Sequence, residues 1–276
     1  MKKRIVTIFI HGTLLPAVFL KIPFLKNFFV CPQGLHPLSE LQKSFHLASP
    51  FHLASLGTLL CEEDPELFDK DSFFLFGWSG DLSVTKRRKA AAELTASVLD
   101  LIEKYASEGI SIGLRIIAHS HGGNVALHLA ETVTNKEFTI DELILLACPV
   151  QKGTASYITN PLFSSIYSVH SHLDVIQRMD PQGIHNFLNS VSTTGLEFTV
   201  AHLNLMGPVF SGRHFKPSPR LTQLHVKYPS RELFHIEFIL QDYIKSLPGF
   251  IRYLHTLPKE GTHQEELVYV IPPRQK

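Results

Sequence analysis

The chain is short of cysteine, of net charge and of long uninterrupted apolar runs, and each shortage excludes a class of protein. Its three cysteines, Cys31, Cys61 and Cys148, are an odd number in 276 residues, which argues against a disulfide scaffold and favours a reducing compartment. The formal net charge is only +1, and no basic stripe alternates with aromatic residues, so nucleic acid is not an expected partner. With 44% hydrophobic and 18% charged residues, the composition predicts a globular protein with one large core.

The N-terminus places basic residues before apolar ones, as a signal peptide does. Its apolar run has only about half the usual length, and no small-residue cleavage site follows it. A second apolar stretch, Leu14–Val30, is interrupted by two prolines and two lysines, which argues against a membrane-spanning helix. We therefore expect a cytoplasmic protein, with export by a signal-independent route left open.

Short apolar, β-branched runs alternate with longer helical patterns along the chain. Strands are expected at Ile5–Ile10, Phe73–Phe76, Leu114–Ala118 and Leu143–Ala147, and helices at Val84–Ser107 and His121–Thr134. This alternation predicts the α/β class, with a doubly wound and mostly parallel sheet. No turn signal or composition shift marks a second domain, so we predict a single domain over residues 1–276, in which Val268–Ile271 is either an edge strand or part of a loose tail.

Residues 14–60 follow the first expected strand as an insertion, and this segment is expected to carry specificity. Its apolar first part, Leu14–Val30, is interpreted as a lid or the wall of an acyl pocket, with core packing and contact with a membrane surface as alternatives. The sequence FHLAS occurs twice within Phe45–Ser55. Two copies are too few for a solenoid, so a local duplication is expected there.

The most informative stretch is Ile116–Asn124, IIAHSHGGN, in which an apolar run ends abruptly at Ser120 and two glycines follow. The pattern predicts a strand, a sharp turn that carries the serine, and the start of a helix. Such a turn lifts the hydroxyl clear of the sheet toward a base and a carbonyl carbon, and its strained backbone needs small neighbours, here Ala118 and Gly122. The helix start also directs the backbone N–H of His121 at the reacting centre, where it suits an oxyanion.

On these residues the chain resembles the α/β-hydrolase superfamily, and within it the lipase-like serine esterases. The matching segment is AHSHGG, with Ala118 in place of the first glycine of G-x-S-x-G. The resemblance implies an α/β-hydrolase fold with an apolar insertion after the first strand. It also implies a second oxyanion N–H from the residue after His11-Gly12, which is Thr13 or Leu14. Leu14 and Trp78 are the expected substrate-lining residues, with ordinary packing as the alternative for Trp78.

The same resemblance implies the other members of a Ser-His-Asp triad. The acid is expected after the strand that follows the nucleophile unit, and Asp174, near the end of the β-rich run Ser165–Val175, is the first choice, with Asp180 as its competitor. The base is expected in a loop between the last core strand and the last helix. Because Leu221–Tyr228 reads as that strand and His235 opens the amphipathic run after it, we predict His235 as the base.

Spacing alone does not choose among the histidines that follow the expected acid, which are His185, His202, His214, His225, His235, His255 and His263. His214 is the second choice, because its loop also follows a strand-like run. His225 lies inside an expected strand, which favours a packing role. In the predicted mechanism His235 takes the proton of Ser120, and an acyl-enzyme forms and is then hydrolysed by water.

The predicted function is hydrolysis of an acyl ester, a small molecule or lipid with a substantial apolar part, without metal or cofactor. Thioester or amide hydrolysis and acyl transfer would use the same triad, and the oligomeric state is left open. A catalytically inactive module with the same fold is a second hypothesis. Metal hydrolysis is a third, because His170, His172 and Asp174 form an H-x-H-x-D pattern that resembles the metallo-β-lactamase fold, although Val175 stands where that family has another histidine. Alternating histidines of a strand point to one face, so His170 and His172 are expected to lie together.

Overall fold

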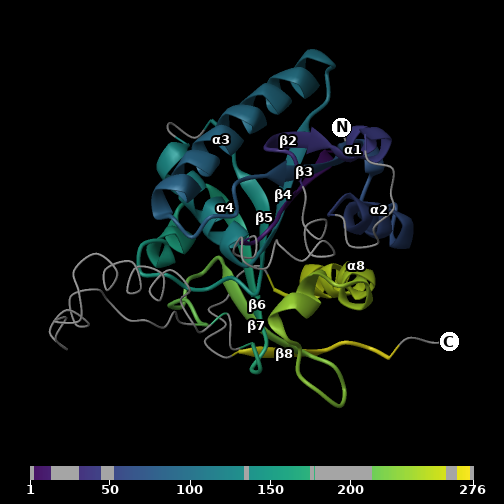
Figure 1. Cartoon of the computed structure of the whole chain (residues 1–276), viewed down its shortest axis with the longest axis vertical. Helices are drawn as coiled ribbons and strands as arrows, with labels where there is room; N and C mark the ends of the chain where they lie inside the picture. The colour runs from purple at the N-terminus through teal and green to yellow at the C-terminus, as the bar shows by residue number, and fades with distance from the viewer. Residues whose placement is uncertain are drawn as a thin grey trace, which may run out of the picture.

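The computed structural model describes residues 3–13, 31–44, 53–133, 137–174, 177, 213–258 and 266–273. These residues form an eight-stranded sheet in the order β2-β3-β1-β4-β5-β6-β7-β8, with helices on both faces (Figure 1). Only the β2–β3 pair is antiparallel. The expected α/β class with a mostly parallel sheet is therefore confirmed.

The strands are β1 (Arg4–Ile10), β2 (Gly34–Pro37), β3 (Phe73–Gly77), β4 (Ile112–His119), β5 (Ile140–Leu146), β6 (Phe163–His170), β7 (Leu221–Lys227) and β8 (Leu267–Val270). The α-helices are α1 (Leu38–Ser44), α2 (Leu53–Glu63), α3 (Val84–Ser107), α4 (His121–Thr132) and α8 (Gln241–Thr256). Three short 3₁₀ helices, η3 (Lys70–Ser72), η4 (Ala155–Thr159) and η5 (His235–Ile239), complete the described elements.

Helix α3 begins and ends where the sequence predicts. Ser83 caps its start by accepting a hydrogen bond from the N–H of Lys86, and the chain leaves it through Gly109, whose φ of 73° suits glycine. The expectation for Ser165–Val175 is partly wrong, because β6 ends at His170. The chain turns there, since the N–H of His172 donates to the carboxylate of Glu232 instead of extending the strand ladder.

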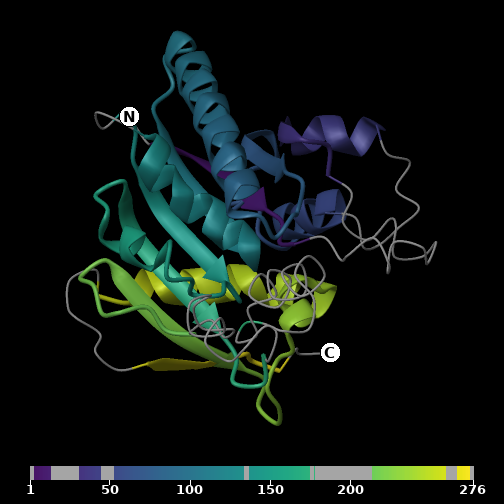
Figure 2. The ribbon, with the colours of Figure 1, turned by 60° about the vertical axis from the view of Figure 1, so that its left-hand side comes forward.

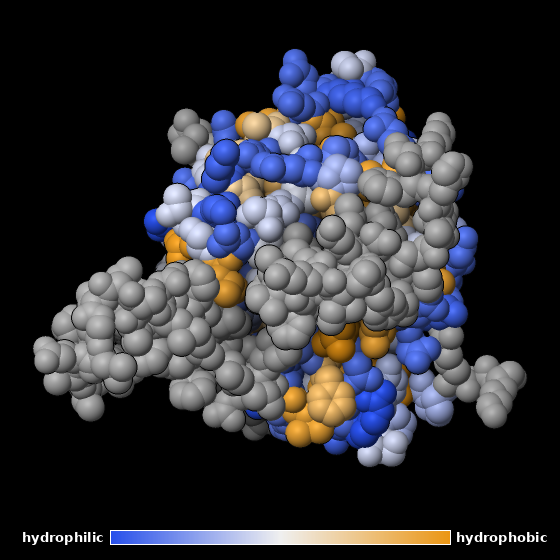
Figure 3. All heavy atoms as spheres, in the orientation of Figure 1, coloured by the Kyte–Doolittle hydropathy of each residue, from blue (hydrophilic) through white to orange (hydrophobic). Residues whose placement is uncertain are grey.

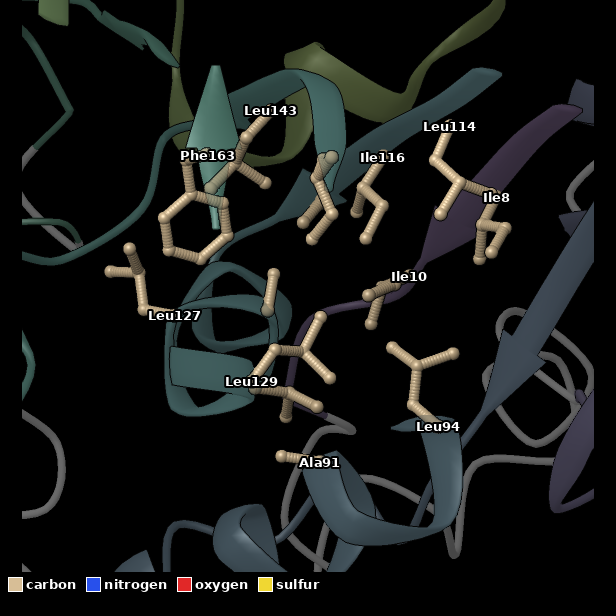
Figure 4. Packing of buried hydrophobic residues seen from close by; sticks show 14 of the residues in the cluster. Ile8, Ile10, Ala91, Leu94, Leu114, Ile116, Leu127, Leu129, Leu143 and Phe163 are labelled. Carbon is tan, nitrogen blue, oxygen red and sulfur yellow. The ribbon is translucent and has the colours of Figure 1, made fainter. Parts of the chain in front are cut away.

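Alternating side chains of the central strands build two apolar cores. Ile8, Ile10, Ile116 and Leu143 point to the face that α3 and α4 cover, as Figure 4 shows. Their chain neighbours, among them Phe9 and Ile117, point to the opposite face and pack with α2 and α8. A strand buried on both faces reads as a continuous apolar run, which is why β1 and β4 are visible in the sequence. Figure 2 shows α3 and α4 side by side against the sheet.

The sheet reverses its winding direction at β1. From β1 the chain proceeds to β3 on one side and then to β4 on the other, and β1 lies between these two strands. In open parallel sheets, a crevice forms beyond the carboxyl ends of the strands at such a point. The turn after β1 and Ser120 after β4 both lie at this edge.

Part of the expected insertion belongs to the body of the fold. Within 14–60, the described residues form β2, α1 and most of α2, and Leu38, Leu53 and Leu60 are buried in the core shared with α8. Residues 14–30 and 45–52 lie outside the described ranges, so the lid and the duplicated loop stay predictions.

Polar side chains cover the free end of α3 (Figure 3). None of the helices described here has the length and apolarity to cross a membrane.

Candidate active site

Ser120 is the single residue between β4 and α4, and its backbone is strained. Its φ of 52° and ψ of −131° lie in a region that non-glycine residues sparsely populate. The N–H of Ser120 donates to the carbonyl oxygen of Leu146 at 2.8 Å, and its own carbonyl accepts from the N–H of Gly123 at 2.9 Å. These two bonds hold the sharp strand-to-helix turn that the sequence predicts.

Two glycines allow the turn after β1 to lie directly against the turn that carries the serine. A Cβ atom on Gly122 would lie 2.4 Å from the carbonyl oxygen of His11, and one on Gly12 would lie 2.7 Å from Cβ of Ser120. Neither separation leaves room for a side chain, so glycine is required at both positions. The close approach brings Gly12, the residue before Thr13, directly against Ser120.

Three side chains from separate parts of the chain form a hydrogen-bonded series. The hydroxyl of Ser120 donates to Nε2 of His235 at 2.9 Å, and Nδ1 of His235 donates to Oδ2 of Asp174 at 2.8 Å. Ser120 is 5% exposed and Asp174 is fully buried, whereas the His235 side chain keeps 11% of its surface exposed. The three residues predicted as nucleophile, acid and base are thus brought together in the predicted order.

No protein-family model and no curated protein matches the chain. In the site, a hydroxyl, an imidazole and a carboxylate form a hydrogen-bonded series. Such a series can move the hydroxyl proton to the imidazole while the carboxylate fixes the tautomer of the ring and stabilises its charged form.

Asp174 is held by groups that the sequence did not single out. Its Oδ1 accepts from the backbone N–H of Gln177 at 2.8 Å, and the side-chain amide of Gln177 donates to the carbonyl oxygen of Cys148 at 2.9 Å. Arg213 donates to the backbone carbonyl of Asp174 at 3.1 Å. These partners come from three different segments of the chain, and no local sequence pattern predicts their contacts. They fix the carboxylate so that Oδ2 faces His235.

A second histidine lies against the base. His119 ends β4, its Nε2 donates to the backbone carbonyl of His235 at 3.2 Å, and the two rings lie 4.9 Å apart. Burial, with a smaller contribution from His235, lowers the pKa of His119 well below its ordinary value. His119 therefore stays neutral at physiological pH and adds no competing positive charge beside His235.

His11 and Trp78 lock the turn after β1. The indole N–H of Trp78 donates to the carbonyl oxygen of His11 at 2.8 Å, and its backbone N–H donates to Nε2 of His11 at 3.2 Å. Nδ1 of His11 donates to the carbonyl oxygen of Gly12 at 2.7 Å, and burial lowers the pKa of His11 to about 4. Trp78 is itself buried, so its described contacts fix the Gly12–Thr13 turn, and its contact with a substrate stays a prediction.

The two expected oxyanion donors are the backbone N–H groups of His121 and Thr13. His121 is the first residue of α4, where a backbone N–H has no acceptor within its own helix. Thr13 follows the glycine that touches Ser120, and Leu14, the other candidate, lies outside the described residues. Among the described residues, Oγ1 of Thr13 and both ring nitrogens of His121 are buried without a hydrogen-bond partner.

The other candidate bases that the structure describes are paired with glutamates. His214, the second choice for the base, contacts Glu266 at 3.0 Å, and His225 of β7 contacts Glu232 at 2.7 Å. His255 of α8 pairs with Glu142. His185, His202, His263 and the competing acid Asp180 lie outside the described residues.

Proposed function

We propose that the chain is a serine hydrolase of the α/β-hydrolase type that cleaves acyl esters with an apolar part. The observation that carries the proposal is the position of His235, which is within hydrogen-bond distance of both Ser120 and Asp174. A hydroxyl on one ring nitrogen and a buried carboxylate on the other favour a base over an ordinary packing role for this histidine. The strained turn at Ser120 supports the same proposal, because such strain persists where the surrounding structure enforces it, commonly at functional sites.

The reaction follows from the direction of these hydrogen bonds. Ser120 Oγ attacks the acyl carbonyl carbon as its proton passes to Nε2 of His235, and the carbonyl oxygen becomes an oxyanion that the N–H groups of His121 and Thr13 stabilise. His235 then returns the proton to the leaving alkoxide, which departs as an alcohol and leaves the acyl group on Ser120. Water attacks the acyl-enzyme with His235 again as base, and the acid product and free Ser120 result.

Exposed apolar residues adjoin the acid and the base along the chain. Leu173, next to Asp174, is 48% exposed, and Phe234 and Ile236, on either side of His235, are 56% and 40% exposed. Single exposed apolar residues are common, but three that directly adjoin two members of one hydrogen-bonded series favour a substrate with an apolar part. This arrangement supports an alkyl ester over a small charged ester.

Labelling by a fluorophosphonate probe tests the proposal. The probe phosphonylates an activated serine, so wild-type protein is expected to be labelled and S120A to show no labelling. H235A is expected to label at least about 100-fold more slowly, since general-base assistance typically contributes 10²–10⁴-fold. H255A is the matched control, because His255 also pairs with a carboxylate but lies on α8, and its labelling rate is expected to equal that of wild type.

Turnover of p-nitrophenyl esters then defines the acyl part. The value of kcat/KM is expected to rise from acetate toward medium-length acyl chains if the exposed apolar residues contact the substrate. A thioester or amide preference would appear as faster turnover of those substrates by the same labelled serine. Folded wild-type protein that shows neither labelling nor turnover would overturn the proposal in favour of a non-catalytic binding module.

A further inference from the structure

Histidines and glutamates gather beyond the carboxyl ends of β6 and β7, outside the proposed catalytic series. The cluster contains His170, His172, His214, His225, Glu232 and Glu266. The register of the sheet creates it, because His170 and His225 are paired across β6 and β7, and Glu266 directly precedes β8. The rings of His172 and His225 stack at 3.7 Å, and those of His170 and His214 lie 4.7 Å apart. The proposed hydrolysis uses none of these residues.

Glu266 is the centre of the cluster. Its Oε1 accepts from Nε2 of His170 and lies 3.0 Å from Nε2 of His214, and its Oε2 lies 3.6 Å from Nε2 of His172. The donor atoms of His170, His214 and Glu266 all lie within 4.8 Å of one another. A tetrahedral ion with ligand distances of about 2.0 Å places its ligands about 3.3 Å apart, so small shifts of His214 and Glu266 would suffice to bind one.

We propose that His170, His214 and Glu266 bind one divalent transition-metal ion of the zinc type, with the remaining coordination position open to water. Two imidazoles and a carboxylate are a typical ligand set for Zn²⁺, whereas the hard cations Mg²⁺ and Ca²⁺ prefer oxygen ligands. The three ligands come from separate segments of the chain, so the ion would tie these segments together. The proposal does not rest on the hydrolase function.

Hydrogen bonds connect the cluster to the segments that carry Asp174 and His235. Directly after His170, Ser171 donates to Glu232 at 2.8 Å and accepts from the N–H of Leu233 at 3.0 Å. Ser171 lies three residues before Asp174, and Leu233 lies two residues before His235. An ion on His170 would therefore steady the junction between the segment that carries the acid and the segment that carries the base.

The affinity is expected to be moderate. Metal-binding histidines usually donate their second ring N–H to an orienting partner, and losing such a partner typically weakens binding about 10- to 100-fold. Nδ1 of His170 is buried without a partner among the described residues. We therefore expect binding weaker than at a fully supported structural zinc site.

Calorimetric titration of Zn²⁺ into chelator-treated, full-length protein tests the site, with metal content measured after dialysis. One ion per chain and a rise in melting temperature are expected for wild type. The variants H214N and E266Q change partly exposed side chains, and circular dichroism at matched temperature checks that they fold. Each is expected to weaken binding at least about 10-fold. H255N is the matched control and is expected to bind as wild type does, since His255 also pairs with a glutamate but lies on α8.

A second set of donors, His172, His225 and Glu266, shares the central carboxylate and must be separated from the first. H172N is expected to weaken binding less than H214N does. The opposite order would overturn the assignment of the ligands. Absence of stoichiometric binding to wild type, or equal affinity in wild type, H214N and E266Q, would overturn the site itself.

Discussion

Replacement of Asp174 by asparagine tests the series most sharply, because both carboxylate oxygens have a defined donor. Oδ2 accepts from Nδ1 of His235, and Oδ1 accepts from the backbone N–H of Gln177. An asparagine has one oxygen and one NH₂ group. Whichever way the amide is turned, its NH₂ group faces a partner that donates a hydrogen bond in the wild type, in a fully buried position.

The two orientations of the amide have different consequences. If NH₂ faces Gln177, a buried donor is left unsatisfied, which costs about 1–3 kcal/mol of folding free energy. If NH₂ faces His235, the imidazole changes tautomer so that Nδ1 accepts, and Nε2 then carries a hydrogen and cannot take the proton of Ser120. The second orientation avoids the clash with the backbone, because the ring can change tautomer and the N–H of Gln177 cannot. We therefore expect a folded protein with kcat/KM lower by about 10⁴-fold, which corresponds to about 5.5 kcal/mol of transition-state stabilisation.

The assay compares kcat/KM for a p-nitrophenyl ester with the free energy of urea unfolding in wild type, D174N and two controls. D242N changes an exposed aspartate in the first turn of α8, and D180N changes the other aspartate that the sequence offered as the acid. Both controls are expected to remain within about threefold of wild type. A D174N protein that retains more than a tenth of wild-type activity, or a larger loss in D180N, would refute the assignment of the acid.

Three further outcomes follow from the geometry. Burial lowers the pKa of His11 to about 4, so the folded protein is favoured above about pH 6.5 and loses this stability as the pH falls toward 4. From pH 7 to pH 5, the free energy of urea unfolding is therefore expected to fall by about 2 kcal/mol more in wild type than in H11Q. The Cβ of G122A would lie 2.4 Å from a backbone oxygen, so this variant is expected to lower the free energy of urea unfolding by about 1–3 kcal/mol. G153A is the control, because the space around Gly153 is open, and it is expected to change that free energy by less than about 1 kcal/mol. S120G is expected to be more stable than S120A by about 1 kcal/mol in thermal unfolding, because only glycine adopts the positive φ without strain, and equal stability would show that the turn is not strained.

The sequence predicts those elements whose signals lie within the element itself. The strand, turn and helix around Ser120 are continuous in the chain, and α3 carries its own start and stop signals at Ser83 and Gly109. Strand β2 was missed, because four residues that include His36 and Pro37 show no apolar alternation and pair only at the sheet edge. The end of β6 was placed too late, because a side chain 60 residues away, Glu232, satisfies the backbone there.

The order of elements along the chain predicted which residues belong to the candidate site, but not the contacts between them. Ser120 follows from its turn, and His235 follows from its position after a strand, but the hydrogen bonds between them depend on the whole sheet. The histidine pattern at His170 and His172 predicted a shared face, and their rings lie 6.1 Å apart. Their partner Glu266 is 96 residues from His170 and has no local signal, so a cluster of this kind becomes visible only in three dimensions.

The distance along the chain between Ser120 and His235 has a consequence for protein synthesis. The two residues are 115 positions apart, and ribosomes add about 5–20 residues per second, so the serine precedes its partner by roughly 6 to 23 seconds. During that interval the nascent chain carries an elbow serine with no imidazole beside it. In the proposed mechanism, reactivity arises only once β6 and β7 have joined the sheet and His235 of η5 lies beside Ser120, so the appearance of probe labelling would time a late step of folding.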